Sequence, residues 1–426
     1  MQEQTIEAWL NAKQGKTYRY KLEKVEYVLD RWGRPEKNFP SIHIAGTNGK
    51  GSVGAFLANL FREQGYRAGR FVSPHLETVR DRITIDSDMI SKEKFDSLAR
   101  KVRVAEEELL NCFEPFNYFE TVFLIAVLYF QEAYQKQQVD VVLMEVGIGG
   151  LLDTTNVLEP RLSIITSIGL DHQDLLGDSL EAIAKQKAGI IKAGVPVVLG
   201  PLPSQAKKVC LERAENVQAP IYCYGSDFSF KDKKYIDSQT GNLDRLNIGL
   251  EGSYQEENAA VALKAFLLYL NGANLNVDKV RMALAETKWP GRLERMRQDP
   301  AIYLDGAHNL PALERLTDFI LGQDYTSITI LFSALKRKDF LPMIALIQSK
   351  LVNVDLVCTS FDFPGSMSEV DLPDGLPFYP QAEKFIRTWL KKKDEKAVLF
   401  VTGSLYFVSS IRPFLLSMKD DQDGDE

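Results

Sequence analysis

The chain is poor in cysteine and has neither a long hydrophobic run nor an excess of positive charge. Its four cysteines include no Cys-x-x-Cys pair, so the sequence offers no zinc or redox motif and no dense disulfide framework. The longest unbroken apolar run, residues 122–130, has nine residues, well below the roughly 20 that a membrane-spanning helix needs. Lys and Arg total 51 against 58 Asp and Glu, a net charge of −7, which argues against nucleic acid as the main partner.

The N-terminal residues also lack the basic region and apolar stretch of a secretory signal. Together with the cysteine usage, this predicts a cytoplasmic globular protein that binds neither nucleic acid nor membrane. At roughly 150 residues per domain, the length favours two or three domains.

Short apolar segments alternate with helical patterns along the chain, which is typical of parallel sheets with crossover helices and predicts an α/β fold. We expect two domains, residues 1–295 and 296–426, because Trp289-Pro290-Gly291-Arg292 breaks the pattern. Residues 221–250 favour hairpin strands, and the acidic end from about Lys419 is expected to be disordered. The predicted strands are residues 41–45, 69–72, 139–144, 162–168, 195–199, 301–304, 328–332, 354–359 and 397–401.

The clearest motif is a glycine-rich loop between the first predicted strand and an amphipathic helix. Backbone N–H groups of such a loop can surround a phosphate, while a lysine reaches the terminal phosphates and a hydroxyl ligates magnesium. The spacing departs from the general P-loop pattern, and a plain glycine turn is the alternative. The loop reads Ala45-Gly46-Thr47-Asn48-Gly49-Lys50-Gly51-Ser52.

Three other predicted strands end in polar or glycine-rich segments: Ser73-Pro74-His75-Leu76, Glu145 to Gly150, and Leu170-Asp171-His172. Ligands of open α/β sheets bind beyond the carboxyl ends of the strands, and the Glu145 carboxylate suits magnesium. Each segment alone is equally well explained as an ordinary turn. Together they favour one site.

The helix after His172 carries an unusual lysine. Asp178 and Glu181 have the spacing of an N-cap and its reciprocal partner, and Lys187 falls on the apolar stripe that follows. From periodicity alone, the favoured interpretation is that Lys187 reaches out to solvent. If it is buried instead, the neutral amine is stabilised and can take up carbon dioxide as a carbamate, which would make Lys187 a carboxylate-like metal ligand.

In the second predicted domain, Asp305-Gly306-Ala307-His308-Asn309 and Thr402-Gly403-Ser404-Leu405-Tyr406 also follow strands. Both segments can present polar groups to a nucleotide, or they are ordinary strand-to-helix turns. Arg292, before the predicted boundary, can contact phosphate or form an ion pair.

These motifs, in this order, resemble the folylpolyglutamate synthase and dihydrofolate synthase family of Mur-ligase-type amide ligases. The resemblance covers nearly the whole chain and includes Lys187-Ala188-Gly189-Ile190 and Trp289-Pro290-Gly291-Arg292-Leu293-Glu294. It implies an N-terminal P-loop-containing Mur-ligase-type ATPase domain and a smaller C-terminal Rossmann-like α/β domain that acts as the glutamate ligase domain.

The resemblance also implies a reaction. ATP phosphorylates the terminal carboxylate of a folate, and L-glutamate attacks the acyl phosphate to give an amide, ADP and phosphate. The implied cofactors are two Mg²⁺ ions, with room for a monovalent cation, and the implied partners are ATP, L-glutamate and either a folate or dihydropteroate. We expect a monomer.

The resemblance assigns roles to residues of this chain. Lys50, carbamoylated Lys187 and His172 are the implied catalytic residues. Those implied for ATP are Gly46, Thr47, Asn48, Gly49, Lys50, Gly51, Ser52, Asn258, Arg292, Asp305 and His308; for metal, Ser52, Ser73, Glu145, His172 and Lys187; and for folate or glutamate, Pro74, His75, Arg82, Asp153, Asn156, Ser404 and Tyr406.

Two other functions stay open. A P-loop regulatory protein would bind nucleotide without making an amide, although the chain has no Asn-Lys-x-Asp guanine motif. A ligase that adds amino acids to a cell-wall nucleotide precursor would share the ATP site and differ in its acceptor. The Ser73-Pro74-His75-Leu76 segment and the two-domain length favour folate.

Overall fold

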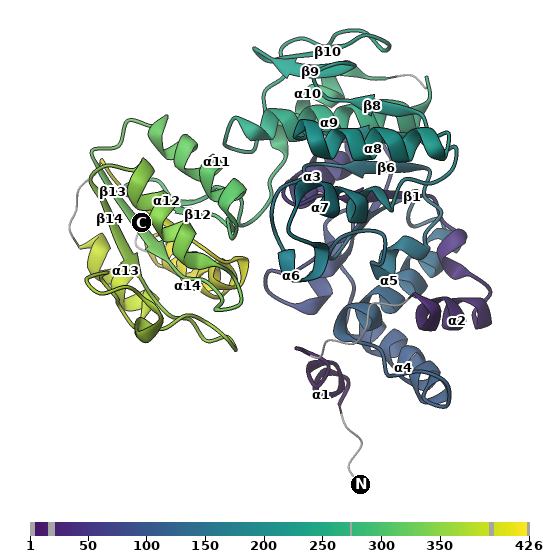
Figure 1. Ribbon diagram of the computed structural model, residues 1–426, viewed down its shortest axis with the longest axis horizontal. Coiled ribbons are helices and arrows are strands. Elements are labelled where there is room, and N and C mark those ends of the chain that lie inside the picture. Colours follow the sequence, from purple (N-terminus) through teal and green to yellow (C-terminus); the bar gives the residue numbers. More distant parts are fainter. Residues whose placement is uncertain (1–4, 16–21, 273–274, 392–395, 424–426) are drawn as a thin grey trace. The chain divides into compact units, whose positions relative to one another are not determined.

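The computed structural model describes the whole chain except residues 1–4, 16–21, 273–274, 392–395 and 424–426 (Figure 1). The chain forms two compact units, one of residues 1–249 and 256–287 and the other of residues 250–255 and 288–426. The sequence places the boundary after residue 295, whereas the structure places it between Thr287 and Lys288. The reason is that β11 (Glu294–Arg297) pairs with β12 (Ala301–Leu304) in the sheet of the second unit.

The first unit is built on an eight-stranded sheet in the order β4-β3-β2-β5-β1-β6-β7-β8. The strands from β2 to β8 in this order are parallel, and β3 and β4 add an antiparallel edge. Their bounds are β1 (Ser41–Ala45), β2 (Ala68–Phe71), β3 (Ile83–Ile85), β4 (Asp88–Met89), β5 (Val141–Glu145), β6 (Leu162–Ile165), β7 (Val197–Leu199) and β8 (Ile221–Cys223).

Helices pack on this sheet through apolar clusters, and two of them join described residues of helices and strands. One cluster joins Val122 and Val127 to strand residues such as Phe71 and Val142, and the other joins Ile183 and neighbours to the far strands. The helices of the chain before the second sheet are α1 (Ile6–Asn11), α2 (Glu23–Arg31), η1 (Pro35–Lys37), α3 (Lys50–Glu63), η2 (Val79–Arg82), α4 (Lys92–Leu109), α5 (Tyr118–Gln135), η3 (Thr154–Val157), α6 (Gln173–Leu176), α7 (Leu180–Ala188), α8 (Ser204–Asn216), α9 (Tyr254–Leu270) and α10 (Val277–Glu286).

A hairpin of β9 (Phe228–Lys231) and β10 (Lys234–Asp237) lies beside α9 (Figure 1). A buried ion pair fixes it there, because Lys264 Nζ lies 3.0 Å from Asp237 Oδ2 with both side chains fully buried. Tyr235 donates a hydrogen bond to the same carboxylate at 2.7 Å. The predicted hairpin is thus confirmed for these two strands, whereas β8 joins the large sheet as a parallel strand.

The second unit has a five-stranded sheet in the order β11-β12-β15-β13-β14. β12, β15 (Ala397–Thr402), β13 (Ser327–Phe332) and β14 (Val354–Cys358) are parallel, and β11 is antiparallel at the edge. One face packs against α11 and α12, and Trp389 of α13 bonds Thr329 of β13 from the other face. The helices are α11 (Leu310–Leu321), α12 (Phe340–Lys350), η4 (Glu369–Asp371), α13 (Ala382–Leu390) and α14 (Leu405–Asp423).

The α/β class and all nine predicted strands are confirmed, with end shifts of a few residues. The N-cap prediction at Asp178 is wrong, because Ser179 accepts the hydrogen bond from Ala182 N at the start of α7. The expected disorder from Lys419 is not tested at its far end: α14 extends to Asp423, and residues 424–426 lie outside the described chain. Within the described residues, no helix is both long and apolar enough to cross a membrane.

Candidate active site

The glycine loop connects β1 to α3, as predicted, and close contacts require glycine at two of its positions. A Cβ on Gly46 would lie 1.9 Å from Thr166 Oγ1, and one on Gly49, whose φ is +87°, would lie 2.6 Å from Asn258 Oδ1. Thr166 Oγ1 also donates to Asn48 O at 2.6 Å. The loop backbone therefore packs closely against Thr166 and Asn258. The loop leads directly into the first turn of α3, where backbone N–H groups have no partner inside the helix.

Lys50 and Ser52 lie in the first turn of α3. Lys50 Nζ donates to Gly46 O at 3.0 Å and lies 3.9 Å from Glu145 Oε1 at the end of β5. Ser52 is buried. The structure therefore brings together the loop, Glu145 and Asn258, all of the first unit, around the carboxyl end of β1.

Arg70 is a residue of this site that the sequence reasoning missed. It lies in β2, and its Nη2 donates to Gly51 O at 3.3 Å. Burial lowers the pKa of its guanidinium to about 10, while the nearby Glu145 opposes this shift. A single arginine within a buried strand gives no motif, so only the side-by-side pairing of β2 and β5 shows its place.

Lys187 is buried, with 4% of its surface exposed. The interpretation that it reaches out to solvent is therefore wrong. Burial lowers the pKa of its amine to about 7, helped by the charge of Lys50 and opposed by Asp171 and Asp153. Near neutral pH, a large fraction of this amine is uncharged, which is the form that reacts with carbon dioxide.

The glycine turn after Glu145 packs directly on the end of α7 that carries Lys187. A Cβ on Gly150 would lie 2.6 Å from Gln186 O and 3.0 Å from Lys187 Cα. Leu151 N donates to Gln186 O at 2.6 Å. This contact explains the glycine at position 150 and places Lys187 next to the segment that begins at Glu145.

Asp153, an expected folate or glutamate residue, is buried inside the same turn. It accepts hydrogen bonds from Ile148 N and Thr155 N, each at 3.0 Å, and from Thr155 Oγ1 at 2.5 Å. Thr155 Oγ1 in turn lies 2.8 Å from His43 Nε2 of β1. Because the hydroxyl donates its one proton to the Asp153 carboxylate, its oxygen accepts from His43 Nε2. Burial and Lys192 lower the pKa of His43 to about 3, so this ring is neutral.

Asn156, the other candidate from this segment, is also buried, and its Nδ2 donates to Leu151 O at 2.9 Å. His172 begins α6 with φ of +50°, and its backbone N–H donates to Asp171 Oδ1. Asp171 is one of the two acidic groups that raise the pKa of Lys187, the other being Asp153. The loop after β6 therefore contributes charge beside Lys187.

The segment after β2 brings His75 and Arg82 together. Arg82 Nε donates to His75 Nδ1 at 3.0 Å, and its guanidinium lies 5.3 Å from the centre of the Tyr118 ring. Burial and the charge of Arg82 lower the pKa of His75 to about 4. Ser73 and Pro74 precede this pair and are joined by a cis peptide bond.

In the second unit, Arg292, Asp305 and His308 form a group at the carboxyl end of β12. Asp305 accepts from Leu293 N and Ala307 N, both at 2.9 Å. Burial raises the pKa of Asp305, and Arg292 opposes that shift. His308 Nδ1 lies 2.8 Å from Gly306 O, and a Cβ on Gly306 would lie 2.3 Å from Arg292 Nη1.

Ser404 and Tyr406 lie at the start of α14, after β15, which neighbours β12. Ser404 Oγ accepts from Tyr406 N at 3.2 Å. The Tyr406 ring stacks on Phe363, with centroids 4.4 Å apart. No sequence pattern indicates this aromatic partner, because Phe363 lies in an irregular segment.

The residues expected to ligate magnesium have suitable chemistry. Within the described chain, no group of three His, Cys, Asp or Glu side chains is gathered to hold a metal. Mg²⁺ is commonly held by one or two carboxylates with phosphate and water oxygens, so such a cluster is not required. The Glu145 carboxylate lies beside the glycine loop, near Lys50. The loop has no room for a Cβ at Gly46. This arrangement fits a magnesium–phosphate group.

Comparison with known proteins identifies the class of this fold and site. The Mur ligase middle domain family matches residues 44–266, more than half of the chain. The chain therefore belongs to the Mur ligase family of ATP-dependent ligases.

Within this class, the chain belongs to the folylpolyglutamate synthase and dihydrofolate synthase family. It is 35% identical to the dihydrofolate synthase/folylpolyglutamate synthase of Bacillus subtilis, with 96% of this chain and 98% of the relative covered. It is 33% identical to the folylpolyglutamate synthase of Lacticaseibacillus casei, with coverage of 92% and 94%. The structure of E. coli FolC in complex with DHPP and ADP matches with a TM-score of 0.87 at 27% identity, covering 97% of this chain and 98% of that one.

Proposed function

We propose that this protein is an amide ligase that uses ATP to add L-glutamate to folates. The observation that carries this proposal is the position of Lys50 Nζ between Gly46 O and Glu145 at the start of α3. Family membership supports it, since relatives carry the names folylpolyglutamate synthase and dihydrofolate synthase over nearly the whole chain. The solved FolC structure contains ADP and DHPP.

The proposed reaction has two steps. A carboxylate oxygen of the folate attacks the γ-phosphorus of ATP, and the bond to the β-phosphate oxygen breaks, which gives an acyl phosphate and ADP. The amine of glutamate then attacks the acyl carbon, the C–O bond to phosphate breaks, and the amine proton leaves. Phosphoryl transfer needs mainly positioning and neutralised charge, which Lys50 and the N-terminus of α3 supply in the first unit.

The remaining residue roles belong to this proposal. Ser52, Ser73, Glu145, His172 and carbamoylated Lys187 would hold Mg²⁺, which supplies charge neutralisation on the phosphates. Lys187 would gain its carbamate when its uncharged amine forms a bond to the carbon of CO₂ and releases one proton. We assign the first unit to ATP binding and, in the second unit, Arg292, Asp305 and His308 to ATP and Ser404 and Tyr406 to glutamate. Cytoplasmic location and a monomeric state complete the proposal.

The acceptor of glutamate in this proposal is dihydropteroate, a folate that already bears glutamate, or both. His75 and Arg82, with Pro74, are the proposed folate contacts, because a neutral imidazole paired with a guanidinium suits a ring and a carboxylate. Asp153 and Asn156 are further proposed folate or glutamate residues. Their side chains hydrogen-bond to the backbone of the turn after Glu145 and so fix its shape.

ADP release tests this function against its rivals. Folate plus glutamate should stimulate ADP release, whereas a cell-wall nucleotide precursor should not. The Lys50→Ala variant should lose the stimulated rate, by about 100-fold or more if it removes a group that neutralises transition-state charge. Lys37→Ala is the matched control, because Lys37 forms a surface ion pair with Glu159. Equal rates in the wild type and Lys50→Ala would overturn the assignment of the loop.

A further inference from the structure

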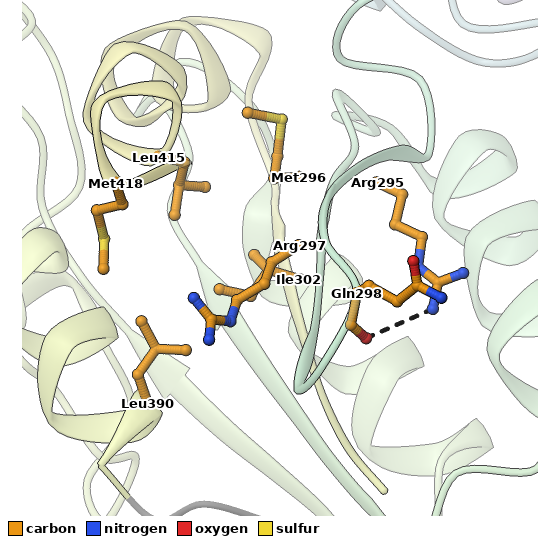
Figure 2. Close-up of a pocket in the computed structure, with 8 residues that line it drawn as sticks. All are labelled: Arg295, Met296, Arg297, Gln298, Ile302, Leu390, Leu415 and Met418. Atoms are coloured by element: carbon orange, nitrogen blue, oxygen red, sulfur yellow. Dashed lines mark hydrogen bonds between the residues drawn. The ribbon is translucent and has the colours of Figure 1, made fainter. Parts of the chain in front are cut away.

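The second unit has a pocket of about 320 Å³ at the end of the sheet opposite to Asp305, His308 and Ser404 (Figure 2). Its position follows from the elements that line it. Ile302 is the second residue of β12, and Leu390 ends α13. Leu415 and Met418 lie in the second half of α14, which runs back from the carboxyl end of β15. The pocket is therefore separate from the residues that the proposed function uses.

A bulge in β11 gives this pocket its charge. The β11–β12 register pairs Arg295 with Tyr303 and Arg297 with Ile302, so an extra residue, Met296, lies between the two pairs. Side chains two apart on a regular strand share a face, but the bulge turns them to opposite faces. Arg295 accordingly lies over the Tyr303 ring at 5.7 Å, while Arg297 is on the face of Ile302.

Figure 2 shows the consequence for the two arginines. The Arg297 side chain extends toward Leu390 and Met418, and the Arg295 side chain extends the other way, where it bonds Gln298 O. Arg297 Nε donates to Asp299 O at 3.0 Å, which fixes the base of the guanidinium. The eight lining residues include no acidic side chain. Arg295 also lines the pocket, but its guanidinium is directed away, toward Gln298 O. The pocket thus presents the Arg297 cation beside walls of Met296, Ile302, Leu390, Leu415 and Met418.

We propose that this pocket binds a small organic anion with an apolar body, such as an aromatic sulfonate or carboxylate. Its volume is within the range of small-molecule sites, about 300–1,000 Å³, which combine apolar walls with a few placed polar groups. The guanidinium of Arg297 recognises the anionic head by charge-assisted hydrogen bonds, and the sulfur and aliphatic side chains pack on the apolar body.

The same pocket is connected to the loop of Arg292. Glu294, at the start of β11, accepts from Gly291 N at 2.8 Å and from Arg412 of α14 at 2.9 Å. A ligand between β11 and α14 therefore touches both elements that hold this loop. We infer that the pocket is an effector site whose occupancy changes the KM for ATP. This second part rests on the proposed function, whereas ligand binding itself does not.

The test uses the full chain and the fluorescent probe 8-anilinonaphthalene-1-sulfonate, titrated with ADP present at saturation to keep the nucleotide site occupied. We expect one saturable site. Arg297→Leu should weaken its affinity about tenfold or more, because a charge-assisted hydrogen bond is lost. Leu415→Trp should abolish binding by filling the pocket. The matched control is Arg295→Leu, which removes the same charge from the same strand and should bind as the wild type does.

Each outcome decides one part of the proposal. Equal affinity in the wild type, Arg297→Leu and Leu415→Trp would overturn the pocket as the binding site, as would an equal loss in Arg295→Leu. Circular dichroism of Arg297→Leu, whose side chain is only half-buried, checks that the fold is kept. If the probe binds as expected but leaves the KM for ATP unchanged, the effector role is overturned while the site stands. Absence of any ligase activity would overturn the proposed function without changing the binding result.

Discussion

The reactivity of the Lys187 amine depends on its burial. The sequence places it on an apolar stripe, and the structure buries it and lowers the pKa of its amine to about 7. Periodicity could not decide between burial and solvent exposure, because the deciding contact, the Gly150 turn against Gln186 and Lys187, joins segments 37 residues apart along the chain.

We predict that Lys187→Ala lowers the ligation rate by about 100-fold or more. The variant loses a proposed ligand of the Mg²⁺ that neutralises charge in the transition state. The measurement is the rate of ADP release with saturating folate and glutamate, with circular dichroism to check the fold. Lys185→Ala is the matched control, because Lys185 lies in the same helix and is exposed. Full activity of Lys187→Ala would exclude the carbamate.

Substitutions at Thr155 test the hydrogen bonds that link His43 to Asp153. Thr155→Val keeps the shape but leaves the buried His43 Nε2 without its partner, which costs about 1–3 kcal/mol. Asp153 Oδ1 loses the hydroxyl and keeps the hydrogen bond from Thr155 N. Because Asp153 also holds Ile148 N, we expect kcat to fall more than the KM for ATP changes. Thr155→Ser retains the hydroxyl and should restore most of the rate. If Val and Ser behave alike, the hydroxyl has no such role.

At the scale of elements, the buried pair of Lys264 and Asp237 attaches the β9–β10 hairpin to α9. Removing one partner of a buried pair costs about 3–5 kcal/mol, so Lys264→Met should lower the free energy of unfolding of the first unit by that order. Lys231→Met, at an exposed position of β9, is the control and should change little. Urea unfolding followed by circular dichroism measures both.

The same pair predicts a pH dependence. Burial raises the pKa of Asp237, but hydrogen bonds from Tyr235, Gln239 N and Lys264 outweigh it and lower that pKa to about 2. A carboxylate with a lowered pKa in the folded state stabilises the fold above its usual pKa of about 3.9 and loses that contribution as the pH falls toward 2. The difference between the wild type and Lys264→Met should therefore shrink between about pH 4 and pH 2. A constant difference over this range would contradict the assignment.

The sequence predicts elements well where the pattern is local. The parallel strands are continuous apolar segments with glycine or polar residues at their ends, so nine of the ten in the described chain were predicted. The tenth, β8, was assigned to the hairpin region instead. The antiparallel edge strands β3 and β4 are short and partly exposed, and they carry little apolar signal. The N-cap of α7 was assigned one residue too early because Asp178 and Ser179 are both good caps, and only backbone geometry separates them.

The candidate site shows the same limit. The glycine loop, Glu145, Asp305 and His308 were singled out because each lies at the end of a predicted strand within a short motif. Arg292 was singled out because it stands just before the predicted domain boundary. Arg70, Thr166 and the His43–Thr155 bond were not, because strand pairing and loop contacts bring them in from distant parts of the chain. A single sequence records which residues follow each other, and such contacts depend on which strands are neighbours.

At the scale of the whole molecule, the chain combines two α/β units, each with polar groups at the carboxyl ends of its parallel strands. The first holds the glycine loop, Lys50 and Lys187, and the second holds Arg292, Asp305 and His308. Relatives cover nearly all of this chain, so both units belong to the family's common architecture.

The central claim is that this protein forms an amide between a folate and L-glutamate. The most direct measurement is the mass of the product after incubation with magnesium, ATP and glutamate, with tetrahydrofolate monoglutamate in one sample and dihydropteroate in another. The tetrahydrofolate should gain the mass of one or more glutamyl residues, and a gain in both samples would identify a bifunctional enzyme. No gain in either sample, with ATP still bound, would contradict the claim.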